Sequence, residues 1–411
     1  VVAEHNRTDF LTLKDFFLEH PALLGELAAC YQYWIALTDC DGFRIDTLKH
    51  VSPEEARNFC GSIKEFTANI GKQDFLLVGE IAGGDYNQDR YLDVLKRNLN
   101  AALDIGELRL ALNAVARGLQ HPDVYFSGFD PGRAEMGSHR QLGEKHVSVL
   151  DDHDHVFGQK IRFSSEAASA HQVAAGVALQ LFTLGIPCIY YGTEQALAGP
   201  EPGERHWLPD WKGSDRYLRE AMFGPQHPRK TGRDGLTDTA AGFDQDLPGF
   251  GPFGTAGQHC FDPQHPTYRR IAAMNALRAG FPALRQGRQY QRPIAFLGYP
   301  FGIYGGGEII AWSRILDDEE VLCVLNPHGN QARGADVLVD ATLTPAGRFT
   351  VVLNSAAANP QSFTGTNATG STVSIKRHPN GIAYVEIRQL GPSEVLVLSN
   401  QPKAREGGIR S

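Results

Sequence analysis

The sequence predicts an α/β fold, a (β/α)8 TIM-type barrel, followed by an antiparallel β-sandwich domain. Helical periodicities alternate with short apolar runs up to about residue 280, which is the pattern of a parallel sheet with crossover helices. Three of these runs, at residues 42–46, 76–80 and 150–154, carry acidic residues at their C-terminal ends. An α/β barrel builds its functional site from such strand ends, collected from separate parts of the chain.

The elements of the α/β part follow from periodicity and from helix-start signals. Apolar residues repeat at helical spacing over residues 21–37, and Pro21 suits the first turn of that helix. Ser52 and Pro53, followed by Glu55, form a capping box that begins the next helix. We expect helices over 21–37, from 53 onward, 87–99, 107–119, 167–183 and 266–279, and strands at 42–46, 75–80, 101–105, 146–150 and 186–190.

The last part of the chain has a different pattern. From about residue 290, seven strand-like runs follow one another, separated by turn residues, as in an all-β sandwich. Residues 192–261 are instead rich in glycine, proline and charge, and so long a loop in a compact domain is usually functional. We therefore predict a barrel domain at residues 1–287, which includes the loop at 192–261, and an all-β sandwich domain at 288–411.

The predicted strands are too few for a closed barrel. About five are found in the α/β part, whereas a (β/α)8 barrel needs eight. The three strands that are lacking would be the first three, which leaves strands four to eight in this chain. The N-terminus also lacks an initiator methionine and a signal-peptide pattern. We therefore expect that the chain starts inside a longer protein.

Composition and charge exclude several classes of partner. The formal net charge is −8 and no basic run opposes it, which argues against nucleic acid or an anionic membrane as the main partner. No apolar stretch is long enough to span a bilayer. The six cysteines form no CxxC pair, so we expect buried free thiols rather than a zinc site. This pattern favours a reducing compartment, and the absence of a visible signal peptide favours the cytoplasm.

Two of the strand ends carry carboxylates suited to acid–base chemistry. Arg44 and Asp46 lie two apart on a strand and share a face, so the guanidinium can orient the carboxylate and keep it ionised. Glu80 follows an apolar strand, and an apolar environment raises the pKa of a carboxyl group, as a general acid requires. Taken singly, each has a structural alternative, namely an ordinary ion pair for Asp46 and an ordinary strand-end glutamate for Glu80.

The third strand end, residues 151–155, is a cluster of acids and histidines with three interpretations. Carboxylate and imidazole groups are metal ligands, so a metal site competes with a sugar-binding site and with a solvated turn. Neighbouring strand residues point to opposite faces, however, so the five side chains cannot all converge. The three strand ends together, within one α/β domain, favour acid–base cleavage of a glycosidic bond.

Four ordered motifs give the chain a resemblance to the α-amylase superfamily of glycoside hydrolases. They are the Gly-x-Arg-x-Asp segment at 42–46, the strand ending in Glu80, the His-Asp pair at 153–154, and the Gly-x-Pro-x-x-Tyr-x-Gly-x-Glu segment at 185–194. The sandwich after residue 290 resembles the C-terminal domain of that family. A further segment that the family carries near its third strand, and the domain inserted after that strand, are not found in this sequence.

The resemblance implies a role for each motif residue. Asp46 would be the nucleophile, Glu80 the general acid and then base, and Asp154 the residue that stabilises the oxocarbenium-like transition state. Arg44 would orient Asp46. The remaining implied sugar contacts are His153 in the cleaved subsite and the pair Lys49 and His50 on the leaving-group side.

The implied activity is cleavage of α-1,4-linked glucans or related α-glucosides with retention of configuration. The implied partner is an α-glucan or oligosaccharide. No cofactor is required for the chemistry and no residue is assigned to a metal, although a structural calcium ion is compatible with the family. Three alternatives stay open: a transglycosylase, which shares the first half-reaction, an inactive N-terminally truncated fragment, and a metal-dependent hydrolase built on residues 151–154.

Overall fold

The computed structural model describes residues 14, 16–81, 94–129, 139–154, 162–197, 219, 262–357 and 366–401. Residues 87–93 of the predicted 87–99 helix, and most of the predicted 192–261 loop, lie outside the described residues. The chain forms two compact units, one made of residues 1–107 and 130–148 and the other of 108–129 and 149–411. The boundary predicted at 287/288 between a barrel and a sandwich domain stays a prediction.

The first unit contains parallel strands and the helices that connect them. The strands are β1 (Gly42–Ile45), β2 (Leu76–Glu80), β3 (Ala101–Asp104) and β4 (His146–Val149), paired in that order. The helices are α1 (Pro21–Thr38), α2 (Pro53–Asn69) and the short α6 (His139–Lys145). As predicted, Pro21 begins α1, and the hydroxyl of Ser52 accepts a hydrogen bond from the backbone N–H of Glu55 (3.3 Å) to cap α2.

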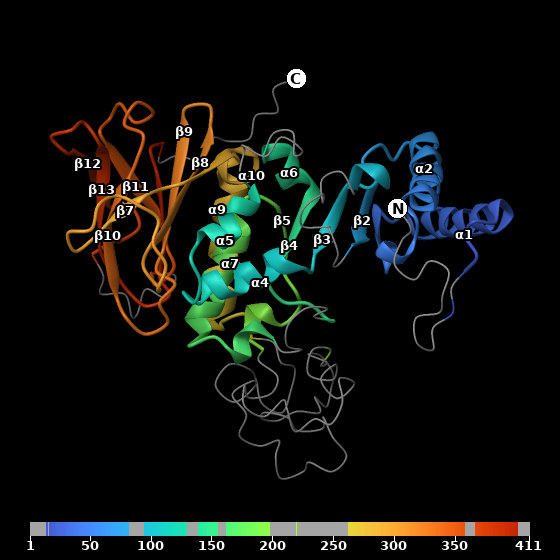
Figure 1. Ribbon diagram of the computed structural model, residues 1–411, viewed down its shortest axis with the longest axis horizontal. Coiled ribbons are helices and arrows are strands. Elements are labelled where there is room, and N and C mark those ends of the chain that lie inside the picture. The colour runs from blue at the N-terminus through green and yellow to red at the C-terminus, as the bar shows by residue number, and fades with distance from the viewer. Residues whose placement is uncertain are drawn as a thin grey trace, which may run out of the picture. The chain divides into compact units, whose positions relative to one another are not determined.

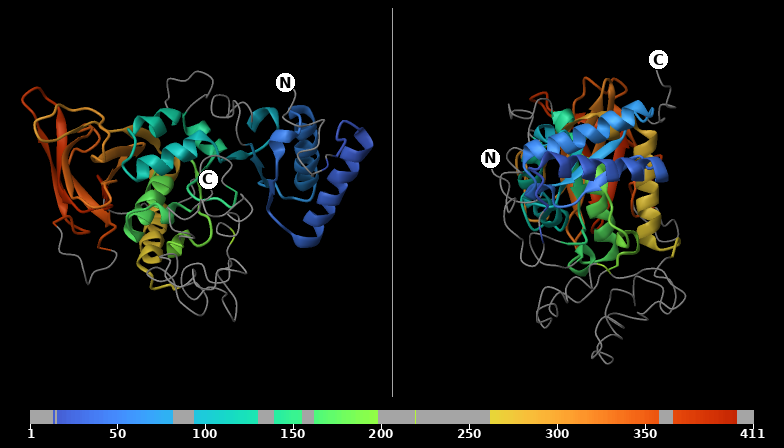
Figure 2. Two further views of the ribbon diagram at one scale, coloured as in Figure 1. Left: turned by 60° about the horizontal axis from the view of Figure 1, so that its bottom comes forward. Right: turned by 90° about the vertical axis from the view of Figure 1, so that its right-hand side faces the viewer.

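The two faces of the β1–β2 pair have different roles. Phe43 and Leu77 point to one face and join a core with α1 and α2, which lie side by side in Figure 2. Side chains alternate along a strand, so Arg44 and Glu80 point to the other face. The helices therefore anchor the strands from one side and leave the ionisable residues on the other.

The outward side of α1 is apolar but exposed. Only Ala28 and Ile35 of this helix are buried, although its apolar residues repeat at helical spacing. Tyr33 and Trp34 keep 61 % and 51 % of their surface exposed, and Leu37 is exposed as well. In the described part of the chain, no helix is long and apolar enough to cross a membrane.

The second unit contains the remaining helices and β5 (Ile186–Cys188), two residues shorter than predicted. Its longest helices are α7 (Ala170–Phe182), which is buried along nearly its whole length as predicted, and α9 (Pro266–Gly280), which packs against it. Shorter helices are α4 (Glu107–Ala116), α5 (Asp123–Phe126) and α10 (Pro282–Gln286). Single 3₁₀ turns are η1 (Leu48–His50, in the first unit), η2 (Ser127–Phe129), η4 (Phe163–Ser165) and η5 (Thr193–Gln195).

Nine antiparallel strands complete the second unit (Figure 1). Each of the seven predicted runs contains one strand, and the pair β6 and β7 was not predicted. Sixteen buried apolar residues of these strands and their turns form one core, as expected for a sandwich. The strands, in the order β6-β8-β9-β14-β11-β12-β13-β10-β7, are β6 (Arg288–Gln291), β7 (Ile294–Ala295), β8 (Ile310–Leu316), β9 (Glu319–Leu325), β10 (Arg333–Leu338), β11 (Arg348–Asn354), β12 (Thr372–Arg377), β13 (Ala383–Leu390) and β14 (Val395–Ser399).

The cysteines agree in part with the expectation of buried free thiols. Five of the six lie among the described residues and none of these forms a disulfide. Cys60 and Cys323 are buried as expected, whereas Cys30 and Cys188 are exposed, so the expectation of burial was wrong for those two. Cys30 is exposed because it lies on the uncovered side of α1.

Candidate active site

A single guanidinium joins the first two predicted carboxylates. Arg44, on β1, forms an ion pair with Asp46 through Nη1, and its Nη2 lies 2.8 Å from Oε2 of Glu80 on β2. The parallel register places Arg44 opposite Val78, two residues before Glu80, so the arginine reaches across to the next strand. Arg44, Asp46 and Glu80 are therefore brought together, and we refer to them as the Arg44 cluster.

The two carboxylates of the Arg44 cluster have different surroundings. The side chain of Asp46 is 71 % exposed, whereas that of Glu80 is almost buried. Burial raises the pKa of Glu80, and the nearby Asp46 raises it further. The backbone N–H of Thr47, 3.0 Å from Oε2, and the Arg44 guanidinium lower the pKa, but the raising effects are larger. The pKa of Glu80 is therefore raised above its ordinary value, which is a property that a general acid requires.

The turn after β1 carries the next two predicted residues. Thr47 adopts a left-handed conformation (φ 47°), which aims its N–H at Glu80 and begins η1. Leu48 is buried in the core with α2 and anchors this turn. Lys49 and His50 follow within η1 and are both partly exposed. The segment from Arg44 to His50 therefore carries four predicted site residues on one short stretch of backbone.

The third strand end belongs to the second unit, where Asp151 has a structural role. Asp151 is buried and accepts hydrogen bonds from the backbone N–H of Phe163 (2.6 Å) and from the hydroxyl of Thr193 (2.9 Å). It therefore joins three segments of the second unit, namely residues 151–154, the start of η4 and the start of η5. This use of both carboxylate oxygens disfavours the metal interpretation of residues 151–154.

Asp152 and His153 form an ion pair beside it. Oδ1 of Asp152 lies 2.8 Å from Nδ1 of His153 and accepts a hydrogen bond from the His153 backbone N–H (2.7 Å). Burial acts to raise the pKa of Asp152, but His153 and Arg109 overcome this effect and the pKa is lowered. Asp152 is thus an ionised partner that orients the His153 ring. Among the described residues, no three His, Cys, Asp or Glu side chains are grouped so that they could hold a metal ion.

Asp154, the third predicted catalytic residue, is partly exposed at the end of this segment. Its Oδ1 lies 3.8 Å from Nη2 of Arg219, and Nε of the same arginine donates to the backbone carbonyl of His153 (3.2 Å). Arg219 belongs to the predicted 192–261 loop and is the one described residue between 198 and 261. That the loop is functional stays a prediction.

Sequence reasoning missed one buried residue of this region. Arg162 is fully buried, and its guanidinium lies 4.8 and 4.9 Å from the ring centres of Tyr190 and Tyr191. It also donates to the Tyr191 backbone carbonyl (2.7 Å). The motif at 185–194 indicates Tyr190 alone, because no local pattern indicates that an arginine almost thirty residues away packs on this ring.

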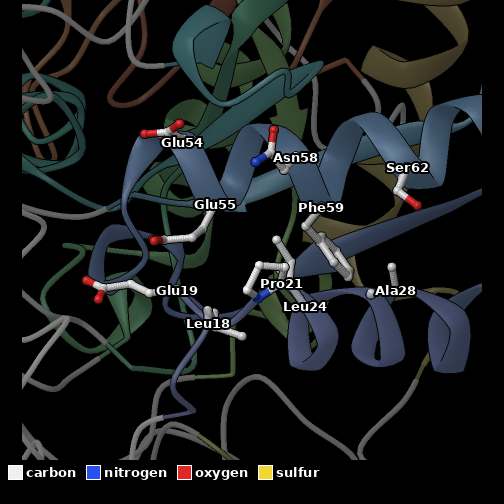
Figure 3. A pocket seen from close by; sticks show the side chains of 11 residues that line it. Leu18, Glu19, Pro21, Leu24, Ala28, Glu54, Glu55, Asn58, Phe59 and Ser62 are labelled. Atoms are coloured by element: carbon white, nitrogen blue, oxygen red, sulfur yellow. The ribbon is translucent and has the colours of Figure 1, made fainter.

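A pocket in the first unit lies apart from the predicted residues. It has a volume of about 350 Å³ and lies between the N-terminal halves of α1 and α2 (Figure 3). Leu24 and Phe59 form part of an apolar wall, and the carboxylates of Glu19 and Glu55 lie at one end. None of the predicted site residues lines this pocket.

Comparison with known proteins places this architecture in one family. An α/β part with parallel strands is followed in the chain by an antiparallel β domain. Residues 5–279 match the family model for the alpha amylase catalytic domain, and residues 305–401 match that for the alpha amylase C-terminal all-beta domain. The chain belongs to the α-amylase family. The predicted fold class is thereby confirmed, while the lack of three strands stays a prediction.

Similar proteins include both hydrolases and transferases. An α-amylase of Streptomyces lividans is 26 % identical over 351 residues, 83 % of this chain and 34 % of that protein. A cyclomaltodextrin glucanotransferase of Klebsiella oxytoca is 25 % identical over 248 residues, 53 % of this chain and 37 % of that protein. The structure of a Geobacillus thermoleovorans α-amylase complexed with acarbose has a TM-score of 0.61 and 19 % identity over 96 % of this chain and 67 % of that one. The chain thus spans about a third of the length of these two curated relatives.

Proposed function

We propose that the chain carries the catalytic residues of a retaining glycoside hydrolase that cleaves α-1,4-linked glucans or related α-glucosides. The observation that carries the proposal is the Arg44 cluster. One guanidinium pairs with an exposed carboxylate and with a nearly buried one, whose pKa is raised by burial. Two carboxyl groups in such different environments have the division of roles that retaining glycosidases need.

Asp46 would act as the nucleophile in the first half-reaction. Its carboxylate oxygen forms a bond to the anomeric carbon while the bond from that carbon to the glycosidic oxygen breaks, and Glu80 gives its proton to the departing oxygen. Arg44 orients the Asp46 carboxylate through their ion pair. In the second half-reaction, Glu80 takes a proton from water, which attacks the anomeric carbon and releases Asp46 with retained configuration.

The remaining roles rest on the family resemblance. Asp154 would hydrogen-bond the sugar hydroxyls of the distorted ring, and His153, held by its ion pair with Asp152, would contact the same sugar. Lys49 and His50 would contact the sugar on the leaving-group side, because they follow Asp46 on the same turn. A calcium ion would be structural in this scheme and take no part in the chemistry.

Transglycosylation is the second candidate function, and the similarity to a cyclomaltodextrin glucanotransferase favours it. The two reactions share the first half-reaction and differ in whether water or a sugar hydroxyl releases the glycosyl group from Asp46. Incubation with maltoheptaose separates them, because hydrolysis gives only shorter products, whereas transfer also gives longer ones.

The test uses the 411-residue chain and the variants Asp46→Asn and Glu80→Gln, with Asp41→Asn as matched control. Asp41 is an exposed carboxylate just before the same strand, paired with Lys72 instead of Arg44. We expect turnover of maltoheptaose by the wild type and by Asp41→Asn, and losses of at least about a thousandfold in the other two.

Three results would contradict the proposal in different ways. Turnover by Asp46→Asn at the wild-type rate would exclude Asp46 as nucleophile. Products of inverted anomeric configuration, observed by NMR, would exclude the retaining mechanism. No turnover by the wild type, although it is folded, would favour the inactive-fragment alternative.

A further inference from the structure

An aromatic hairpin projects from the edge of the nine-stranded sheet. Its first arm is β7, the last strand in the order of that sheet, and two hydrogen bonds between Ile294 and Gly302 close it (2.8 and 3.0 Å). At its tip, the N–H of Tyr299 donates to the carbonyl of Phe296 (2.8 Å). Residues 294–302 thus form a tight β-hairpin that belongs to the C-terminal β domain (Figure 1).

The tip holds a leucine in a conformation that leucine disfavours. Leu297 and Gly298 have φ values of 48° and 85°, as in a type I′ turn. Asn, Asp and Gly are the usual residues at such positions, because a branched side chain is strained there. Leu297 is nevertheless 93 % exposed and gains no burial in return. Leu297 thus presents an apolar side chain to solvent at a position where asparagine or glycine would be less strained.

The ring of Tyr299 next to it is held in place. It stacks on Phe296 with ring centres 5.2 Å apart and planes inclined by 26°. Phe296 packs edge-on against Tyr304, and both pack against the core of the β domain. The hydroxyl of Tyr304 donates to the Pro300 carbonyl (2.6 Å) and braces the hairpin. Tyr299 remains 57 % exposed, so a rigidly supported ring faces solvent.

Polar groups with balanced charge continue the surface from the hairpin. Phe301 lies against Tyr384 of β13, with ring centres 6.0 Å apart, and Tyr384 is opposite Lys376 of β12. Two ion pairs lie nearby, one between Lys376 of β12 and Glu386 of β13 and one between Arg388 of β13 and Asp336 of β10, each at 2.6 Å. Asp336 is opposite Ala295 at the base of the hairpin. Two cations and two anions give no net charge, which matches a neutral ligand.

We propose that Leu297, Tyr299, Phe301 and Tyr384, here called the Tyr299 surface, bind an α-glucan chain. The ligand class rests on the proposed function. A pyranose ring has a flat face of C–H groups that packs on an aromatic ring, while its hydroxyls bond to polar groups at the rim. Four side chains are far fewer than the 20–30 residues a side of a stable protein interface. None of the four is assigned to glycosidic cleavage, so the surface would hold the polymer while another segment is cut.

The test is affinity electrophoresis of the full chain in gels containing glycogen, in the Glu80→Gln background so that glycogen is not digested. The variants are Tyr299→Ala and Leu297→Gly, and Tyr33→Ala is the matched control, an equally exposed tyrosine on α1. We expect the dissociation constant to rise at least fivefold in both hairpin variants and to stay unchanged in the control. Leu297→Gly should melt at the same or a higher temperature, because glycine relieves the positive φ.

Several outcomes would overturn the proposal. One is an unchanged affinity for glycogen in both hairpin variants, and another is that glycogen does not retard the parent chain. A third is that the hairpin variants lose self-association, measured by sedimentation, and keep their glycogen affinity, which would make the surface a protein contact. Turnover of maltoheptaose, measured separately on the wild type, distinguishes the two proposals. If the wild type turns over maltoheptaose but Tyr299→Ala binds glycogen as tightly as its parent, only the proposal for the Tyr299 surface is wrong. If Tyr299→Ala binds glycogen more weakly but the wild type has no turnover, only the catalytic proposal is wrong.

Discussion

Replacement of His171 by glutamine should reduce the loss of unfolding free energy that the protein shows between neutral and acidic pH. His171, near the start of α7, has Nε2 3.1 Å from the hydroxyl of Ser355, which follows β11. Burial, together with the nearby Arg270 guanidinium, lowers the pKa of His171 from 6.5 to about 3. The ring is therefore neutral in the folded protein across the range in which an unfolded histidine becomes charged.

The sign and size of the effect follow from this difference. Below pH 6.5 the unfolded chain binds a proton that the folded chain does not, so stability is lost as the pH falls, until the folded form also titrates near pH 3. At about 1.4 kcal/mol for each tenfold change in proton affinity, His171 removes about 2 kcal/mol between neutral pH and pH 5, and at most about 5 kcal/mol by pH 3.

The assay is urea unfolding at pH 7.5 and pH 5, followed by far-UV circular dichroism. We expect the free energy of unfolding of the His171→Gln variant to fall by about 2 kcal/mol less than that of the wild type between these pH values. His378→Gln is the control, because His378 is exposed in the turn between β12 and β13. Equal pH dependence of His171→Gln and the wild type would refute the reasoning.

Three further variants test the packing. Arg292→Met should lower the free energy of unfolding by about 3–5 kcal/mol, because it leaves the fully buried Glu320 without the guanidinium 2.6 Å away. Adding Glu320→Gln should restore most of the lost stability. A double variant as unstable as Arg292→Met would contradict this explanation. In Gly79→Ala the new Cβ would lie 2.6 Å from a methyl group of Leu99, so the free energy of unfolding, measured by urea unfolding, should fall by about 1–3 kcal/mol. An unchanged free energy of unfolding would show that Leu99 moves freely. Ser52→Ala should cost about 1 kcal/mol by loss of the α2 cap, whereas Ser52→Asp should retain stability.

Local signals were sufficient to predict most elements of the fold. The start of α2 follows from Ser52 and Pro53, and the predicted apolar helix at 167–183 corresponds to α7. Periodicity could not predict what covers a helix. Trp34 and Ile35 both belong to the apolar repeat of α1, yet Trp34 is exposed and Ile35 is buried. A pattern shows which residues share a face, whereas burial depends on the neighbours of that face.

The candidate site was predictable only where its geometry is local. The contact between Arg44 and Asp46 follows from their spacing on a strand, and it is present. That Arg44 also reaches Glu80 depends on the register of β1 against β2, which no short-range pattern specifies. The packing of Arg162 on Tyr190 likewise joins distant segments. Contacts within a few residues could thus be anticipated, and those between strands and loops could not.

The exposed side of α1 provides the protein with a natural optical probe. Trp34 is half exposed there, whereas Trp312 is fully buried and donates to the carbonyl of Phe182 (3.0 Å). The other two tryptophans, Trp207 and Trp211, lie outside the described residues. Any molecule that covers α1 would remove the Trp34 indole from water. The fluorescence emission of Trp34 would then shift to shorter wavelengths and be quenched less by acrylamide. Binding at that helix could therefore be followed without a label, with Trp34→Phe as the blank.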